Sequence, residues 1–343
     1  MKTNNFILAL VILSCFTGCK KDFDLTAPYK EIPVVYGLLN VDSTTHYIRV
    51  QKAFLIDGDA TVAAGITDSI YYSDSITVKL IGYLNGSRKD SFYLHKIDGN
   101  TIGLPKDSGL FANTPNILYT FNGVLKATEN YRLEVSRDGK MIARTTDGSN
   151  VSLVNNFIVN TPYPSIKFNL SNAHPTTFSW QPATNAAIYD LTVRFFYREI
   201  TTSGITEHSI DIPFFNSKIP DDLTSSSNVK ADFTADILLS KLVANLPQST
   251  DITREFKQMN FMFAAGGIEL SNFVASQHAQ TGITSGEALP VYTNIVDGTG
   301  LLSSRYYKQV DSVLFSPAGI DSLACSDISR GLRFKNHFGV VCN

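Results

Sequence analysis

Short runs in which apolar and polar residues alternate recur along most of the chain after residue 31. Ile48 and Val50 alternate with Arg49 and Gln51, and residues 76–80 repeat the same pattern. A period of two with one apolar face is typical of antiparallel strands buried on one side. Asn-Gly and Asp-Gly pairs separate several of these runs and supply turns. The pattern predicts a mainly β protein built of β-sandwiches.

Residues 31–150 are expected to form the first sandwich. Tyr131, Leu133 and Val135 alternate with polar residues, and the segment from Leu125 to Tyr131 precedes them. This segment resembles the tyrosine corner of immunoglobulin-like and fibronectin type III domains, in which a tyrosine hydroxyl bonds back to the preceding corner. The next Asp-Gly turn and residues 141–145 complete a predicted hairpin.

Residues 160–343 are expected to form a second, fibronectin-III-like sandwich with a C-terminal extension. Residues 176–199 resemble the B and C strands of that fold, with Phe178 and Trp180 directed inward before Pro182. Trp180 is the only tryptophan of the chain. We expect it in a hydrophobic core, and the alternative is an exposed platform on which a sugar stacks.

The second sandwich is expected to carry a helical insertion over residues 234–246. Leucines at 238, 239, 242 and 246 recur there at helical spacing, and Pro247 ends the segment. Residues 258–277 predict a strand, a turn at Gly266-Gly267 and a short helix. Residues 306–315 predict one further strand pair.

The first 18 residues have the three parts of a secretory signal: Lys2, an apolar run over residues 6–13, and small residues before Cys19. The run is too short to span a bilayer. Residues 16–19, Phe-Thr-Gly-Cys, resemble a bacterial lipobox, which implies lipidation at Cys19 and a tether over residues 19–30. The alternative is an ordinary cleaved signal peptide. The charged residues 20–24 resemble a surface-export signal, and retention on the periplasmic side is the alternative.

Composition places the whole chain among globular proteins. Hydrophobic residues make up 43% and charged residues 17%, and the formal net charge is −2. Such a chain has no bulk attraction for nucleic acid. Two cysteines follow the lipobox, Cys325 and Cys342, and in an oxidising compartment they can form one disulfide. The alternative is two unrelated thiols.

The order of several segments resembles uncharacterised Bacteroidota outer-membrane lipoproteins that contain a domain of unknown function. The segments that carry the resemblance are PVVYGLLN, HYIRVQKAF, NYRLEV, FSWQPATNAAIYDLTVRFFYRE, ELSNFVASQHAQTGI and PVYTNIVDGTGLLSSRY. The resemblance implies a lipid-anchored surface or periplasmic protein with immunoglobulin-like parts. That family has no established activity, so it implies no catalytic residue.

Motifs for chemistry are sparse. Gly298 and Gly300 begin a dinucleotide-binding pattern, but Ser303 stands where its third glycine belongs. The segment therefore predicts a turn that leads into a strand, or else a contact loop with Asn294, Asp297 and Arg305 as polar contacts. The six histidines stand singly, and no serine occupies a nucleophile elbow.

We expect no cofactor and no metal. Aspartates crowd residues 57–74, but they lack the spacing of an EF-hand, so a solvated loop is favoured over a calcium site.

These observations favour a non-enzymatic binding or assembly component of the cell envelope. Its expected partners are outer-membrane lipid, through Cys19, and an envelope protein. One alternative is a surface glycan-binding module that assists polysaccharide capture. Another is an envelope hydrolase whose site has no sequence motif.

Overall fold

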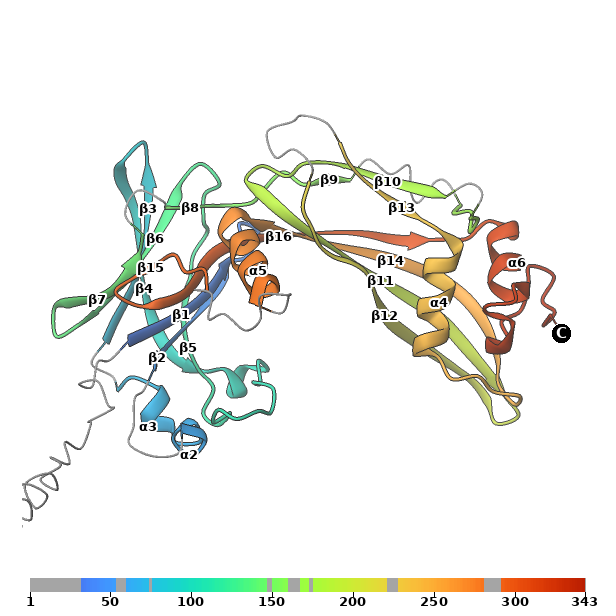
Figure 1. The fold of residues 1–343 in the computed structure, drawn as a ribbon, viewed down its shortest axis with the longest axis horizontal. Helices are drawn as coiled ribbons and strands as arrows, with labels where there is room; N and C mark the ends of the chain where they lie inside the picture. Colours follow the sequence, from blue (N-terminus) through green and yellow to red (C-terminus); the bar gives the residue numbers. More distant parts are fainter. Residues whose placement is uncertain are drawn as a thin grey trace, which may run out of the picture.

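The computed structural model describes most of the chain after the leader. Residues 1–31, which include the predicted lipidation site Cys19 and the tether, lie outside the described part. The described residues form two lobes that meet at helix α5 (Ile268–Gln280) (Figure 1). Both lobes are mainly β, as predicted. The described ranges are 32–53, 60–73, 76–146, 150–159, 167–172, 175–220, 228–280 and 291–342.

The N-terminal lobe contains nine short strands and three short helical segments among the described residues. The strands are β1 (Ile32–Leu39), β2 (Thr45–Ala53), β3 (Ile76–Leu84), β4 (Ser87–Asp98), β5 (Ile117–Asn122), β6 (Asn130–Arg137), β7 (Lys140–Thr145), β8 (Val151–Ser152) and β15 (Ile295–Val296). The helical segments are α2 (Ala60–Ala64), α3 (Thr67–Ile70) and the 3-10 turn η2 (Gly99–Ile102).

The C-terminal lobe is built on long antiparallel strands. Its strands are β9 (Ile158–Val159), β10 (Thr176–Gln181), β11 (Ala186–Thr201), β12 (Gly204–Lys218), β13 (Val229–Phe233), β14 (Thr253–Gly267) and the second half of β16 (Thr299–Val313). The other elements are α4 (Ala235–Asn245), α6 (Pro317–Cys325) and the 3-10 turn η3 (Arg330–Leu332). The short sheet β13-β10-β9 and helix α4 cover one face of the long sheet (Figure 1).

Strand β16 belongs to both lobes. Its first half pairs in parallel with β1, from Val34–Thr299 to Leu39–Ser304, and its second half pairs antiparallel with β14. A single hydrogen-bonded path therefore runs through both lobes, in the order β12-β11-β14-β16-β1-β2-β5-β4-β3-β6-β7-β15. The first half of β16, which we predicted to belong to the end of the second domain, thus completes the sheet of the N-terminal lobe. The strand pair predicted over residues 306–315 is instead the end of this one long strand.

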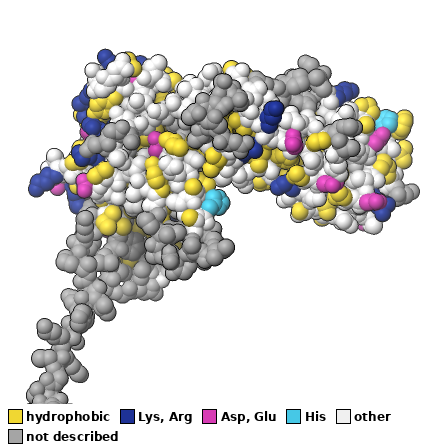
Figure 2. Space-filling view, turned by 45° about the horizontal axis from the view of Figure 1, so that its top comes forward, with side chains coloured by type: hydrophobic (Ala, Val, Ile, Leu, Met, Phe, Trp, Pro, Cys, Tyr) yellow, Lys and Arg dark blue, Asp and Glu magenta, His cyan; other side chains and the backbone are white. Residues whose placement is uncertain are grey.

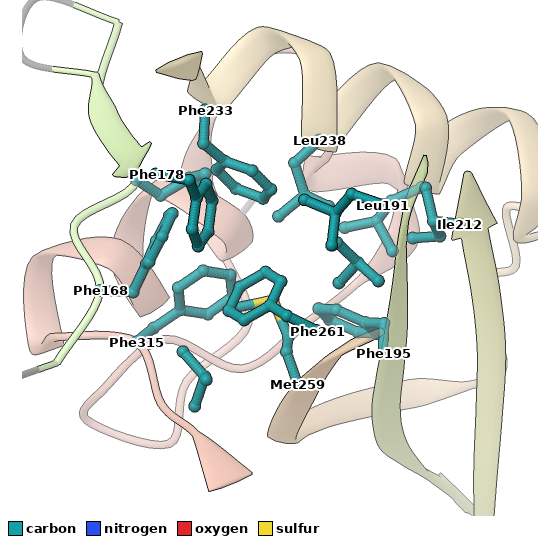
Figure 3. Packing of buried hydrophobic residues seen from close by; sticks show 14 of the residues in the cluster. Phe168, Phe178, Leu191, Phe195, Ile212, Phe233, Leu238, Met259, Phe261 and Phe315 are labelled. Carbon is teal, nitrogen blue, oxygen red and sulfur yellow. The ribbon is translucent and has the colours of Figure 1, made fainter. Parts of the chain in front are cut away.

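Aromatic side chains fill the core of the C-terminal lobe. Phe168, Phe178, Phe233 and Phe261 contact one another between the long sheet and α4 (Figure 3). Trp180 is 0% exposed, which confirms its predicted place in the core. The helix predicted over residues 234–246 is α4, and all four of its predicted leucines are buried.

Two tyrosine hydroxyls bond back to the chain just before their own strands. The backbone N–H of Lys126 donates to Tyr131 Oη at 2.7 Å, which is the hydrogen bond predicted for a tyrosine corner. Burial raises the pKa of Tyr131 to about 12. In the C-terminal lobe, the N–H of Ala183 donates to Tyr189 Oη at 2.9 Å. Each bond fixes a corner with a buried aromatic ring.

Candidate functional site

Helix α5 folds back over the sheet at the junction of the lobes. The helix lies close to the sheet at Gly266. A Cβ added there would lie 2.7 Å from Leu270 Cδ2, on the helix, and 2.8 Å from Ile188 Cγ2, on β11. On the side of the N-terminal lobe, the rings of Tyr36 and Phe273 meet edge to face at 6.2 Å. The helix therefore contacts both lobes, and the glycine at the end of β14 lets it do so.

A cavity of about 230 Å³ lies beside α5 on the outward face of the long sheet. We call it the junction cavity. Small residues form much of its wall, which leaves room next to the helix. Its lining is Leu38, Ile188, Tyr189, Asp190, Ser217, Ala264, Ala265, Gly266, Leu270, Val274, Arg305 and Tyr307.

The polar part of the junction cavity comes from Arg305 and Asp190. The guanidinium carbon of Arg305 lies 5.1 Å from the ring centroid of Tyr307, which is 51% exposed. The Nε of Arg305 is buried and has no hydrogen-bond partner. A carboxylate oxygen of Asp190 accepts from the backbone N–H of Ser217 at 2.6 Å. The cavity thus offers an apolar wall, an aromatic face and the guanidinium side chain of Arg305.

A second cavity, of about 490 Å³, is lined by the start of α5 and by the loop between β10 and β11. Glu269 is part of its wall and is only 7% exposed. The carboxylate accepts a hydrogen bond from Ser303 Oγ at 3.0 Å. Burial raises the pKa of this carboxyl above its ordinary value, because the charged form is poorly solvated there.

We expect Glu269→Gln to stabilise the protein at neutral pH. The raised pKa of Glu269 means that the folded state holds the proton more tightly than the unfolded chain. The wild-type protein therefore loses stability as the pH rises from the unfolded pKa through the folded one. The glutamine avoids this loss, so its melting temperature should exceed that of wild type at pH 7 and converge with it at acidic pH. A constant difference at every pH would contradict the argument.

The three polar contacts predicted near residue 300 do not share one site. Asn294 is 4% exposed, and its amide pairs with the backbone of Leu302 through both its donor and its acceptor. It therefore holds the turn between β15 and β16 in place. Asp297 lies exposed at that turn with a left-handed φ of 60°. Arg305 alone lines the junction cavity.

The sequence contained one further signal for the junction cavity. Tyr306 and Tyr307 are neighbours on a predicted strand, so their rings must point to opposite faces and one of them must face outward. Tyr307 is the exposed one. Asp190 and Leu270 had no such signal, because other strands and the helix bring them to the cavity.

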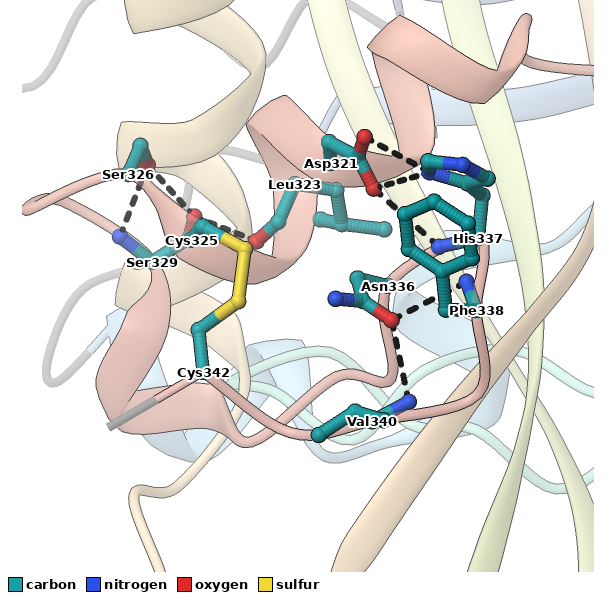
Figure 4. Close-up of a disulfide and its surroundings, with 10 residues drawn as sticks. All are labelled: Asp321, Leu323, Cys325, Ser326, Ser329, Asn336, His337, Phe338, Val340 and Cys342. Carbon is teal, nitrogen blue, oxygen red and sulfur yellow. Dashed lines mark hydrogen bonds and ion pairs between the residues drawn. A yellow bond between two sulfur atoms is a disulfide. The ribbon is translucent and has the colours of Figure 1, made fainter.

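The remaining predicted site residues, Cys325 and Cys342, lie at the far end of the C-terminal lobe. They form a disulfide with a Cα–Cα distance of 5.1 Å (Figure 4). Close by, His337 Nδ1 lies 2.6 Å from a carboxylate oxygen of Asp321. The disulfide and this pair hold the chain end against α6, so their evident role is structural.

Groups of three or more histidine, cysteine or acidic side chains that could hold a metal do not occur among the described residues. Several aspartates of the loop considered for calcium lie outside that part of the chain. No described helix is long and apolar enough to cross a membrane.

Comparisons with known proteins give no family. No protein-family model matches the sequence, and no curated protein sequence matches it. Among solved structures, the C-terminal globular domain of an oligosaccharyltransferase from Pyrococcus abyssi is similar at 12% identity and a TM-score of 0.22. The match covers 68% of this chain and 46% of that one. A TM-score this low carries no argument about fold or function.

Proposed function

We propose that this chain is a lipid-anchored protein of the cell envelope that binds a protein partner without catalysing a reaction. The observation that carries the proposal is the junction cavity, where the guanidinium of Arg305 lies beside the exposed ring of Tyr307. Arginine and tyrosine are enriched where protein interfaces gain most of their binding energy. The cavity suits an apolar side chain next to a carbonyl or carboxylate acceptor.

The glycan-binding alternative receives less support from the surface. Sugar-binding faces commonly present several aromatic rings together. Here the exposed large aromatic side chains of the described residues stand singly on separate elements. They are Tyr36, Tyr93, Phe111, Tyr307 and Phe338. On the face seen in Figure 2, apolar side chains likewise form small separate groups among polar ones.

The hydrolase alternative needs two acidic groups in one cleft. Asp190 lines the junction cavity, whereas Glu269 lines the second cavity. Glu269 is also engaged by Ser303, which favours a structural role at the start of α5.

The immunoglobulin- or fibronectin-III-like layout of the two lobes is part of the proposal. It is supported by the tyrosine hydrogen bonds to Lys126 and Ala183, one in each lobe. The anchor at Cys19 and the location at the outer membrane rest on the lipobox resemblance.

The binding surface can be tested with a photo-crosslinking amino acid at position 307 in intact cells. We expect a discrete crosslinked product that disappears when Arg305 is also changed to alanine. Position 93 is a matched control, because the exposed Tyr93 ring has Lys79 Nζ at 5.4 Å, the same kind of pair on the other lobe. Equal crosslinking at both positions, or none at 307, would contradict a binding role for the cavity.

The anchor is tested separately with Cys19→Ala and a membrane-impermeant protease. If the proposal holds, wild type incorporates a labelled fatty acid and the variant does not. Digestion of wild type in intact cells then indicates the cell surface, whereas digestion only after lysis indicates the periplasmic face. Equal fatty-acid labelling of the two proteins would count against lipidation at Cys19.

A further inference from the structure

One end of the N-terminal lobe exposes a concentration of large apolar side chains. It consists of α2, the turn after it, and the loop between β4 and β5. We call it the apolar end and define it by Val62, Ile66, Ile102, Leu104, Leu110 and Phe111. Their exposed fractions are 64%, 50%, 39%, 41%, 70% and 50%, respectively. Monomeric proteins seldom leave so many large apolar groups exposed on neighbouring segments without a contact to make.

Hydrogen bonds hold these segments together as one surface. The backbone N–H of Ala112 donates to the carbonyl of Ala64 at 2.8 Å, which ties the loop to α2. The ammonium of Lys106 donates to the carbonyl of Ala112 at 3.2 Å and lies 5.2 Å from the ring centroid of Phe111. Figure 1 shows α2, α3 and the loop side by side at the same extremity of the lobe.

The chain enters the lobe at this same end. Ile32, the first residue of β1, pairs with Ala53, and the chain continues from Ala53 toward α2. The loop between β4 and β5 also begins and ends there, because Asp98 pairs with Ile117, and β5 runs antiparallel to β2 with Tyr119 opposite Ile48. The tether and the apolar end therefore leave the sheet at one edge. Strand β16 runs parallel to β1, away from this edge and into the other lobe.

We propose that the apolar end lies in the interface of the membrane to which the tether is attached. This inference rests on the proposed anchor at Cys19. Twelve residues, 20–31, separate that cysteine from Ile32. Fully extended they span at most about 40 Å, and as a flexible coil roughly 20 Å. A lobe held this close to a bilayer, with its apolar end at the point of attachment, can bury those side chains among lipid head groups and upper acyl chains.

The charges of the apolar end indicate which kind of lipid it should bind. Within the described segments 60–70 and 99–116 the charged side chains are Lys106 and the exposed acids Asp68 and Asp107, so these segments carry no net positive charge. Binding is therefore expected to follow apolar burial and to be nearly independent of anionic lipid. The stem of Lys106 can follow the apolar surface while its ammonium reaches the head groups.

The test uses the full mature chain with Cys19→Ala, so that acyl chains contribute nothing. In this background Phe111→Trp places a fluorescent probe at the apolar end, while the native Trp180 is fully buried and supplies a constant signal. With phosphatidylcholine vesicles we expect a blue shift and quenching by brominated lipid. Vesicles that also contain phosphatidylglycerol should give the same result. Phe338→Trp, at the 77% exposed tip of the other lobe, is the control and should show neither change.

A second variant keeps the proposal falsifiable if the probe perturbs the loop. Leu110→Asp with Phe111→Asp should lower co-sedimentation with vesicles at least about tenfold, whereas Phe338→Asp should not change it. No quenching at 111, or equal sedimentation of the aspartate variants, would overturn the proposal. So would self-association that the paired aspartates abolish, because the apolar end would then be a contact between copies. Failure of the anchor shows separately, as wild-type protein that incorporates no labelled fatty acid.

Discussion

Gly300→Ala is expected to destabilise the protein by more than about 3 kcal/mol. Gly300 pairs with Val35 where β16 enters the N-terminal lobe, and its φ of 115° is a backbone conformation that other residues rarely adopt. A Cβ there would lie 1.9 Å from the carbonyl oxygen of Val35, so one of the two strands must move. The loss should appear as a lower denaturation midpoint, followed by circular dichroism and by the fluorescence of Trp180.

Gly139→Ala is the matched control for this experiment. Gly139 also has a positive φ, of 76°, but a Cβ there would meet nothing within 4 Å. Its substitution by alanine should therefore lower the free energy of unfolding only by the cost of a side chain at positive φ, about 1–2 kcal/mol. If both variants unfold at the same denaturant concentration, the close parallel pairing of β1 with β16 is not present in solution.

Features with a local signal could be predicted from the sequence. The hydrogen bond predicted for Tyr131 joins residues only five positions apart, and it is present. Helix α4 could be predicted because its leucines repeat along one face and Pro247 follows them. Gly266-Gly267 likewise marked the change from β14 to α5.

Features made by distant segments could not be predicted in this way. Val34 pairs with Thr299 across most of the chain, and a parallel pair leaves no turn between its strands. Gly300 therefore resembled a fragment of a nucleotide-binding motif, although its role is to let two backbones approach. Asn294 is a different case, because its partner Leu302 lies only eight residues further along the chain, across the turn from β15 to β16.

The junction cavity shows how much of the candidate site could be predicted from the sequence. Arg305 was among the predicted contacts, but nothing in its own segment indicates Asp190 or Leu270, which different elements bring beside it. A side chain that faces outward from a strand can be inferred from alternation. What lies opposite it depends on strand order and on how α5 folds back.

Arg254→Ala is expected to destabilise the C-terminal lobe by about 3–5 kcal/mol, because it leaves a partly buried charge without its partner. Arg254 is 0% exposed. Its Nε donates to a carboxylate oxygen of Glu199 at 2.9 Å, and its Nη1 donates to the carbonyl of Leu332 at 3.0 Å. The side chain thus ties β14 to both β11 and η3. The free energy of unfolding should fall accordingly in chemical denaturation.

The combination of Arg254→Met with Glu199→Gln separates loss of the charge pair from loss of packing. Methionine restores much of the volume, and glutamine removes the stranded charge, so the double variant should be more stable than Arg254→Ala alone. Arg194→Ala, also on β11, breaks the exposed pair with Asp211 of β12 and should change stability little. If the buried and the exposed variants lose stability equally, desolvation of the Glu199 charge is not the cause. If the double variant is no more stable than Arg254→Ala, the bond to Leu332, and with it the attachment of η3, accounts for most of the loss.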